Sequence, residues 1–260
     1  MNQVDPDKVF KKRGEISYSA LGAQGQLKVV AILNMLQDTA AAHASQLGIS
    51  GFDLAEKNLA WVISRYRIET LYSPEWQEKI EIKTHRFPWK SLYEIRNFTI
   101  SGANGSPAVK ATAAWVMVKK ENKMPVRLNR YMKKELLATP KRVISNPFDE
   151  VEKIKQTDFQ LPFKIRIEDL DLNQHVNNAI YVGWALETVT REILENFRPG
   201  KTDVLFHKSS YYGDTIISRT EIKTKNHSPF TRHAIISKNR DKLLASVNIY
   251  WTSMEKNDLK

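Results

Sequence analysis

Cysteine is absent from the 260 residues of the chain. The sequence therefore excludes disulfide bonds, thiolate metal sites and every mechanism with a cysteine nucleophile. Long apolar runs are missing as well: the longest nearly apolar stretch, residues 111–118, is far below the roughly 20 residues that a membrane-spanning helix needs. Any chemistry must come from carboxylate, imidazole, amide and hydroxyl groups.

Residues 1–14 lack an apolar stretch behind their charges, so we expect no secretory signal and a cytoplasmic location. The composition is otherwise ordinary for a globular protein, with 42% hydrophobic and 27% charged residues, and it excludes a disordered or membrane-embedded chain. At roughly 100–200 residues per domain, the length predicts one large or two small domains.

Negative charge is in short supply, because the formal net charge is +11. The excess is concentrated in residues 119–142, which contain nine basic residues and only two acidic ones. The basic residues are Lys119, Lys120, Lys123, Arg127, Arg130, Lys133, Lys134, Lys141 and Arg142. This block is either a docking face for an acidic partner or a solvated linker. Zinc-finger spacing, RNA-binding aromatic signatures and glycine-rich phosphate loops do not accompany it, which argues against a nucleic-acid partner.

Periodicity divides the chain into two similar halves. In the first, apolar residues recur every three to four positions over 27–48 and stop at Gly48, which predicts an amphipathic helix. Alternating or β-branched segments predict strands at 15–20, 60–71, 79–87, 91–101 and 108–120. The pattern then restarts, with predicted strands at 163–169, 203–211, 214–225, 230–238 and 242–254. A second amphipathic helix is predicted over 179–197, ended by Pro199 and Gly200.

Between the halves the alternation is lost and prolines become frequent, which predicts a linker with one short helix near 132–138. We therefore expect an N-terminal unit over residues 1–120, a basic linker over 121–160 and a C-terminal unit over 161–260. The two units overlay with few gaps: a shift of 136 residues puts Arg96 on Arg232 and Trp115 on Trp251. The shared order of elements predicts an internal duplication, an α+β fold of two units that each wrap a sheet around one helix.

Ionisable side chains occupy only one copy of the segment that precedes the helix. A shift of 149 residues puts Gly22, Gln24 and Gln26 opposite Asp171, Asn173 and His175. This is the pattern expected if one unit kept chemistry and the other was freed for binding. The C-terminal unit is therefore the predicted catalytic unit.

The segment 168–187, EDLDLNQHVNNAIYVGWALE, carries the most concentrated chemistry. Asp171, Asn173 and His175 are two positions apart, so an extended chain would place all three on one side. At a strand rise of roughly 3.3 Å per residue, the outer two would lie about 13 Å apart. The three side chains therefore either bend together where the chain enters the helix or line up along one substrate.

This segment resembles the active-site signature of the acyl-acyl-carrier-protein thioesterase family, which reads much like DLDxNxHVNNxxYxxWxLE. Three further stretches resemble that family at the expected positions: LAWVISRYRIE, ATAAWVMV and the closing SVNIYWT. The resemblance covers the chain from about residue 14 to residue 252. The HVNN core with an upstream aspartate also occurs in acyl-CoA thioesterases of the wider hotdog superfamily, so the two-unit length and the flanking strands carry the narrower assignment.

The resemblance implies a double hotdog fold, each unit an antiparallel sheet around a long helix. It implies that Asp171, Asn173 and His175 are catalytic and that the acyl chain lies largely within the N-terminal unit. The partner would be an acidic acyl carrier protein (ACP) that brings the substrate as a phosphopantetheine thioester, and the basic surplus fits it. Asn178 and Ser209 are the expected substrate-binding residues, and no cofactor or metal is expected. A homodimer is compatible with the sequence.

One departure from the family concerns a glutamate that usually follows the active-site helix. Ser209 or Ser210 falls at its place in FHKSSYYGDT. His175, with an ordinary pKa of about 6.5, is a sensible replacement base. We expect Asp171 and His175 to activate or position water, with direct attack by Asp171 through a mixed anhydride as the variant. Asn173 would orient the thioester or the water, and the helix N-terminus near Asn178 would hold the carbonyl oxygen.

The predicted function is hydrolysis of acyl-ACP to free fatty acid in fatty acid biosynthesis. Two alternatives stay open: an acyl-CoA thioesterase, and a non-catalytic acyl-binding protein that lost turnover with the glutamate. A purely structural interpretation makes the Asp, Asn and His triplet an elaborate helix entry. The other five histidines have no partner pattern and are expected to be structural: His43, His85, His207, His227 and His233. A serine nucleophile is disfavoured, because neither Ser209 nor Ser210 sits in G-x-S-x-G.

Overall fold

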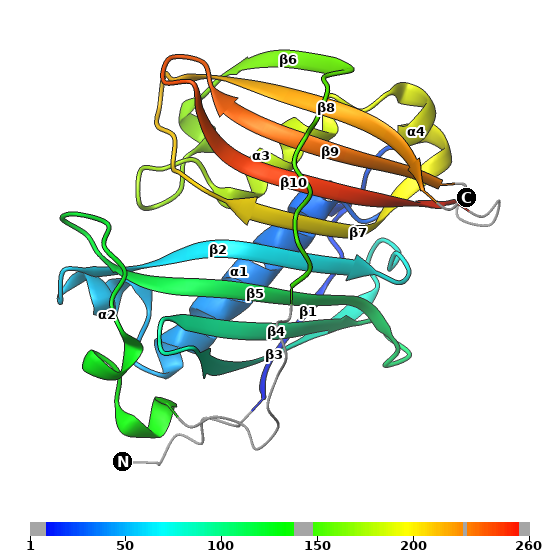
Figure 1. Ribbon diagram of the computed structural model, residues 1–260. Coiled ribbons are helices and arrows are strands. Elements are labelled where there is room, and N and C mark those ends of the chain that lie inside the picture. The colour runs from blue at the N-terminus through cyan, green and yellow to red at the C-terminus, as the bar shows by residue number, and fades with distance from the viewer. Residues whose placement is uncertain (1–8, 138–147, 226–227, 255–260) are drawn as a thin grey trace.

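The computed structural model describes residues 9–137, 148–225 and 228–254. Its ten strands form one antiparallel sheet in the order β1-β3-β4-β5-β2-β7-β10-β9-β8-β6 (Figure 1). The N-terminal half holds β1 (Phe10–Glu15), β2 (Leu59–Thr70), β3 (Lys79–Trp89), β4 (Tyr93–Ser101) and β5 (Pro107–Lys119). The C-terminal half holds β6 (Phe159–Lys164), β7 (Phe197–Phe206), β8 (Thr215–Lys225), β9 (Ser228–Ser237) and β10 (Lys242–Ser253). The predicted α+β double hotdog is confirmed.

One long helix packs on the inner face of the N-terminal half. α1 (Val29–Gln46) buries the stripe Ile32, Leu33, Leu36 and Ala40 against the sheet, as the spacing of its apolar residues requires. The chain leaves the helix at Gly48, whose φ of +66° is a conformation that glycine adopts without a steric penalty. The predicted helix and its glycine stop are confirmed. α2 (Gly51–Ala55) follows as a short helix.

The second predicted helix is wrong in its length. The structure breaks it into α3 (Asn178–Leu186) and α4 (Arg191–Asn196). Thr188 turns the chain out of α3 because its hydroxyl donates to Ala185 O (2.8 Å) and bonds to Thr220 on β8. Pro199 and Gly200 do not end a helix but lie inside β7, where a Cβ at Gly200 would collide with the Thr252 side chain of β10.

The two edge strands were also misplaced by the periodicity. The structure puts β1 at Phe10–Glu15 instead of 15–20, and β6 at Phe159–Lys164 instead of 163–169. Most of their side chains are exposed on both faces, so their sequences do not alternate between apolar and polar. Residues Tyr18–Ala20 and Ile167–Asp169, predicted as strand, are instead 3-10 turns.

The predicted duplication extends to single backbone hydrogen bonds. In the N-terminal unit Gly22 N–H donates to Gln26 O (2.7 Å), and in the C-terminal unit Asp171 N–H donates to His175 O (2.8 Å). An isolated bridge closes each turn, Leu21 to Leu27 in one and Leu170 to Val176 in the other. Each pair of equivalent residues is 149 positions apart, so segments 17–28 and 166–177 are two copies of one loop.

The region expected to be a basic linker is packed. Four of its apolar side chains are buried in a second hydrophobic cluster beside α2: Val126, Leu128, Met132 and Leu136. Residues 126–137 therefore pack onto the N-terminal unit and are not a solvated linker, while Lys141 and Arg142 lie outside the described residues.

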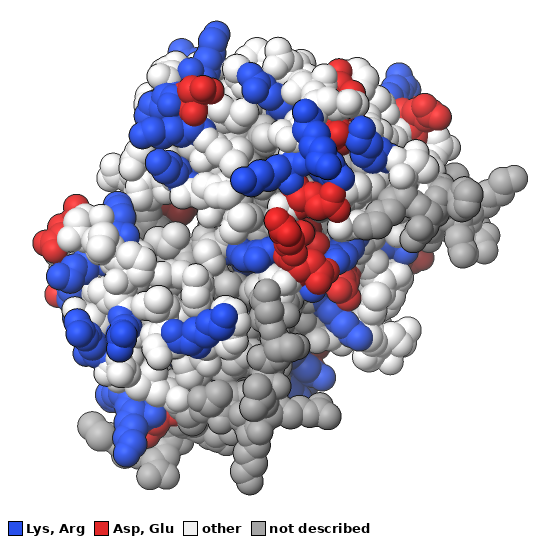
Figure 2. Space-filling model, in the orientation of Figure 1, with Lys and Arg blue, Asp and Glu red and all other residues white. Residues whose placement is uncertain are grey.

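The segment that leads to β6, residues 148–158, crosses the outer face of the sheet (Figure 1). Asp149 pairs there with Arg67 (2.8 Å) on β2 and Lys201 (2.9 Å) on β7, and Glu152 pairs with Arg232 on β9. Figure 2 shows the acidic side chains gathered in the middle of this face with basic ones around them. The segment joins the two halves of the sheet by ion pairs. Among the described helices, none is long and apolar enough to cross a lipid bilayer.

Candidate active site

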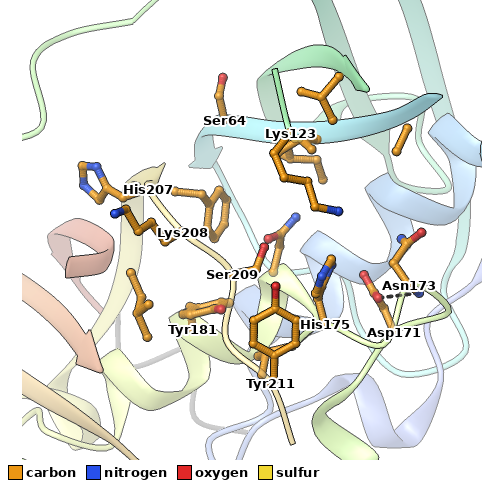
Figure 3. Close-up of a pocket in the computed structure, with 18 of the residues that line it drawn as sticks. Ser64, Lys123, Asp171, Asn173, His175, Tyr181, His207, Lys208, Ser209 and Tyr211 are labelled. Carbon is orange, nitrogen blue, oxygen red and sulfur yellow. Dashed lines mark hydrogen bonds between the residues drawn. The ribbon is translucent and has the colours of Figure 1, made fainter. Parts of the chain in front are cut away.

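A cavity opens where the two halves of the sheet separate. β2 pairs with β7 only from Arg65 to Glu69, so the β2 residues before Arg65 and the chain after Phe206 diverge. The space between them is a cavity of about 710 Å³, lined by residues of both units (Figure 3). The predicted site residues Asp171, Asn173 and His175 all line it.

The chain curls at this point and does not run extended. Asp171 N–H donates to His175 O (2.8 Å), and Gln174 N–H donates back to Asp171 O (2.9 Å). Gln174 adopts a left-handed φ of +61° to close the turn. Asp171 and His175 are therefore opposite each other across a tight turn, and the extended arrangement, with the two side chains about 13 Å apart, is wrong.

The carboxylate of Asp171 is held in place by its own loop. Asn173 N–H donates to Asp171 Oδ1 (2.8 Å), and Figure 3 shows the two residues side by side at the wall of the cavity. The start of the loop is anchored by Asp169, a buried residue whose carboxylate accepts from Arg166 N–H (2.8 Å) and whose carbonyl accepts from Asn177 N–H (2.8 Å). Asn173 itself is exposed, so its side chain is free to meet a substrate.

His175 is half-buried beside Asp171, and Tyr211 contacts it edge to face, with ring centroids 5.0 Å apart. Burial lowers the pKa of His175 below its ordinary value, and the positive charge of Lys123 lowers it further, while Asp171 acts in the opposite direction. The imidazole is therefore neutral at neutral pH, which is the form that accepts a proton.

Lys123 comes from the start of the region predicted as the basic linker, in the turn after β5. Its backbone is left-handed (φ +59°), and its N–H donates to Lys119 O (2.9 Å). In Figure 3 its side chain extends across the cavity toward His175 and Asp171. The basic block therefore supplies a residue to the site, which the sequence indicated only as a general charge excess.

Asn178 and Ser209, the predicted substrate-binding residues, both line the cavity. Asn178 is the first residue of α3, whose leading N–H groups have no partner within the helix. Asn177 is the N-cap: its Oδ1 accepts from Ala179 N–H (3.0 Å) and from the Nε2 of Gln37 on α1 (3.3 Å). The N-terminus of α3 is thus fixed by α1 and directed at the cavity.

Ser209 and Ser210 lie where the family glutamate was expected, and Ser210 has a structural role there. Ser210 is fully buried, its Oγ lies 2.7 Å from Tyr181 Oη, and its N–H donates to that same oxygen (3.1 Å). Ser210 O accepts from Val176 N–H (3.1 Å), so this position supports the loop that carries His175. Ser209, its neighbour, is exposed to the cavity.

Tyr211 and Lys208 also line the cavity and belong to no sequence motif. His207 was expected to be structural, but it also lines the cavity, with Nε2 at 3.0 Å from Ser246 Oγ. Five cationic residues line the cavity: Lys120, Lys123, Lys208, Arg240 and Lys242. Asp171 is the one carboxylate among the described residues that line it. Within the described part of the chain, no group of three or more His, Asp or Glu side chains is placed to hold a metal ion.

The fold and the site together define the class of the protein: a double hotdog protein whose polar loop, residues 166–177, leads into α3. Comparison with known families narrows this class. The chain belongs to the acyl-ACP thioesterase family, whose N-terminal domain matches residues 7–136 and whose C-terminal domain matches residues 152–253.

Two curated relatives are plant proteins. The chain is 29% identical over 202 residues to acyl-[acyl-carrier-protein] hydrolase FATB2, chloroplastic, of Cuphea viscosissima, a match that covers 72% of this chain and 48% of the relative. It is 26% identical over 234 residues to oleoyl-acyl carrier protein thioesterase 2, chloroplastic, of Arabidopsis thaliana, covering 84% of this chain and 64% of the relative. The chain thus spans less than two thirds of the length of these relatives.

Two solved structures share the fold. The 12:0-ACP thioesterase of Umbellularia californica matches with a TM-score of 0.85 and 19% identity, over 95% of this chain and 94% of that chain. An acyl-ACP thioesterase of Bacteroides thetaiotaomicron matches with a TM-score of 0.81 and 21% identity, over 96% of this chain and all (100%) of that chain. These likenesses establish the double hotdog fold over nearly the whole chain.

Proposed function

We propose that the protein hydrolyses acyl-ACP and releases a free fatty acid. The observation that carries the proposal is the turn that places the Asp171 carboxylate and a neutral His175 together at the N-terminus of α3, facing a cavity with five cationic residues. The family membership and the names of the curated relatives support the same reaction.

Asp171 and His175 have different roles in hydrolysis. His175 takes a proton from a water molecule that Asp171 helps to position, and the water oxygen attacks the thioester carbonyl carbon. The carbonyl oxygen becomes an oxyanion, which the N–H groups at the start of α3 and the Asn178 side chain stabilise, an effect typically worth about 2.7–4 kcal/mol per donor. The C–S bond then breaks, His175 returns the proton to the leaving sulfur, and the products are a carboxylic acid and a thiol.

Asp171 also allows a second route, in which its carboxylate attacks the carbonyl carbon and forms a mixed anhydride that water then hydrolyses. The Asn173 N–H bond engages only Oδ1 of Asp171 and is compatible with both routes. Multiple-turnover hydrolysis in oxygen-labelled water tests for the second route, because label enters the Asp171 carboxylate only when water opens the anhydride at Cγ of Asp171.

The acyl group is carried to the site by the acidic ACP and not by CoA. A phosphopantetheine arm brings a phosphodiester and, on ACP, a protein of negative surface charge, and both meet Lys120, Lys123 and Lys208 at the mouth of the cavity. Because ACP presents more negative charge than the short arm, the preference for ACP over CoA should weaken as salt rises. The cytoplasmic location and a homodimer remain predictions from the sequence.

The test is steady-state hydrolysis of decanoyl-ACP and decanoyl-CoA in parallel, at low and high salt. We expect a higher kcat/KM on ACP and a steeper salt dependence for it. Equal kcat/KM on the two carriers would make the protein an acyl-CoA thioesterase. Tight binding of both substrates without release of thiol would instead make it a non-catalytic acyl-binding protein.

A further inference from the structure

A cluster of buried charged side chains lies on the inner face of the N-terminal half of the sheet, under α1. Arg86 and Glu94 have side chains only 1% and 2% exposed, and Arg86 Nε lies 2.7 Å from Glu94 Oε2. Arg96 shares the same carboxylate, with Nη2 3.0 Å from Glu94 Oε1. His43 on α1 completes the cluster, with Nδ1 3.2 Å from Arg96 Nη1.

The cluster holds more positive than negative charge. A guanidinium only donates, so His43 Nδ1 accepts from Arg96 and the imidazole is neutral. Burial, followed by the charges of Arg96 and Arg86, lowers the pKa of His43 to about 4. Two guanidiniums therefore share one carboxylate, and one positive charge is left over in a place where charge is costly.

Apart from the two atoms of the Arg86–Glu94 ion pair, four polar atoms around this cluster have no hydrogen-bond partner within the described structure: Tyr66 Oη, Thr84 Oγ1, Arg86 Nη2 and Trp115 Nε1. The strand register places Tyr66, Ala113, Arg96 and Arg86 in one row across β2, β5, β4 and β3, all facing α1. Tyr66 and Thr84 are fully buried. Buried polar atoms without partners are rare and energetically costly, so four of them around a surplus charge are the features of a site that fits a polar ligand group.

The C-terminal unit shows that the fold does not require unpartnered polar atoms at the equivalent place in its interior. Five of its buried polar side chains form one unbroken run of hydrogen bonds: Trp251 Nε1 donates to Thr231 Oγ1 (3.0 Å), which bonds His233 Nε2 (2.8 Å). His233 Nδ1 then bonds Thr220 Oγ1 (2.7 Å), and Thr220 bonds Thr188. Each hydroxyl and each ring nitrogen of this run has a partner, whereas the cluster under α1 leaves donors open.

The cluster is next to the catalytic cavity. Trp115 lines that cavity and pairs across the strands with Glu94, which puts their Cβ atoms about 4.5–5.5 Å apart. On α1, Gln37 contacts the N-cap of α3, and His43 is six residues further, about 9 Å along the helix. An acyl chain of medium length that enters from the cavity between α1 and the sheet would bring its far end to the cluster.

We propose that this cluster is a polar subsite for the distal end of the acyl chain, which binds an oxygen acceptor there and prefers a carboxylate to a hydroxyl. The preferred substrates are then thioesters of medium-length dicarboxylic or ω-hydroxy acids. A distal carboxylate accepts from Arg86 Nη2 and Tyr66 Oη and neutralises the surplus charge. The inference rests on the proposed hydrolase function, because the thioester end of the chain must lie at Asp171.

The test compares three ACP thioesters of equal chain length: decanoyl, ω-hydroxydecanoyl and the half-thioester of sebacic acid. We expect kcat/KM for the sebacoyl thioester to exceed that for decanoyl by about tenfold or more, the size of one hydrogen bond to a charged group, with the ω-hydroxy substrate between them. A decanoyl thioester that is hydrolysed as well as the sebacoyl one overturns the subsite while leaving the hydrolase function standing.

Two variants locate the preference. Arg86→Met removes the surplus charge, and Tyr66→Phe removes a hydroxyl that has no partner to lose; the sebacoyl-to-decanoyl ratio should fall about tenfold in the first and about threefold in the second. Thr220→Val is the matched control in the C-terminal unit, and it should leave the ratio unchanged. A ratio that stays the same in both N-terminal variants overturns the proposal.

Should none of the three thioesters be hydrolysed, the hydrolase function fails and the subsite is tested by binding. Calorimetry with free sebacate and free decanoate should then show tighter binding of sebacate to the wild-type chain and equal binding to Arg86→Met. Equal affinity of the wild-type chain for the two acids overturns the subsite independently of catalysis.

Discussion

The two copies of one loop, residues 17–28 and 166–177, share a backbone and differ in what their side chains leave open. In the N-terminal copy the side chains satisfy each other, because Gln26 Oε1 accepts from Gln24 N–H (3.1 Å) and Gln26 Nε2 donates to Gln24 Oε1 (3.2 Å). In the C-terminal copy Asp171 accepts one N–H of its own loop, and His175 faces the cavity. The proposed chemistry therefore depends on three different side chains and not on a different turn.

The surroundings of the two loops differ as well. The N-terminal copy is closed by Ser73, whose Oγ accepts from Leu27 N–H (2.6 Å). In the C-terminal copy the equivalent N–H, that of Val176, donates to Ser210 O (3.1 Å). This copy lies where β2 and β7 have separated. The C-terminal copy therefore combines ionisable side chains with an opening in the sheet beside it, and the N-terminal copy has no ionisable side chain at the equivalent positions.

The largest expected effect comes from removing the Asp171 carboxylate. Asp171→Ala should lower kcat for acyl-ACP hydrolysis by about 10²–10⁴-fold, the range of general acid–base catalysis, because the water loses its positioning group. Gln26→Ala, at the counterpart of His175 in the other loop, should leave kcat unchanged. Steady-state kinetics on both variants checks the contrast, and full activity in Asp171→Ala would refute the assigned site.

A smaller effect concerns the free energy of unfolding, which should respond differently to loss of a hydroxyl in the interior of the C-terminal unit and in that of the N-terminal unit. Thr220→Val leaves His233 Nδ1 without a partner and should reduce the free energy of unfolding by about 1–3 kcal/mol. Tyr66→Phe removes a buried hydroxyl that has no partner within the described structure, so its unfolding free energy should stay the same or rise. Urea unfolding measures both variants, and an equal loss in both would mean that the two interiors are equally satisfied.

The smallest effect concerns Lys123, whose positive charge acts on the pKa of His175 from the other half of the chain. Lys123 lowers the pKa of His175, so Lys123→Met should raise that pKa. Because a protonated His175 cannot act as a base, the acidic limb of the pH–kcat/KM profile should move to higher pH in the variant.

Lys120→Met is the control for this shift, since Lys120 lines the cavity but is not among the charges that act on His175. The midpoint of its acidic limb should match that of the wild-type chain. If the two lysine variants move the limb equally, the pKa of His175 responds to general surface charge and not to Lys123.

Most of the fold could be predicted from the sequence, and the errors described above have two causes. α1 and the inner strands β2, β3, β4 and β5 have one buried face, so their apolar residues repeat with the period of a helix or a strand. β1 and β6 are edge strands with little burial on either face, and they carry no such repeat. The break after Leu186 was invisible because Thr188 leaves the helix to meet Thr220, a contact 32 residues away in sequence.

The sequence by itself determined the duplicated α+β units, because these depend on local periodicity. Its resemblance to a family, carried by neighbouring residues of one segment, indicated the double hotdog and the triplet Asp171, Asn173 and His175. Tertiary structure alone decided which distant groups meet that triplet. Lys123, Ser210 and Tyr211 reach His175 and its loop through the divergence of β2 and β7, and the surplus charge under α1 arises from strand register. Such encounters follow from how the sheet pairs and bends, which no spacing within one segment records.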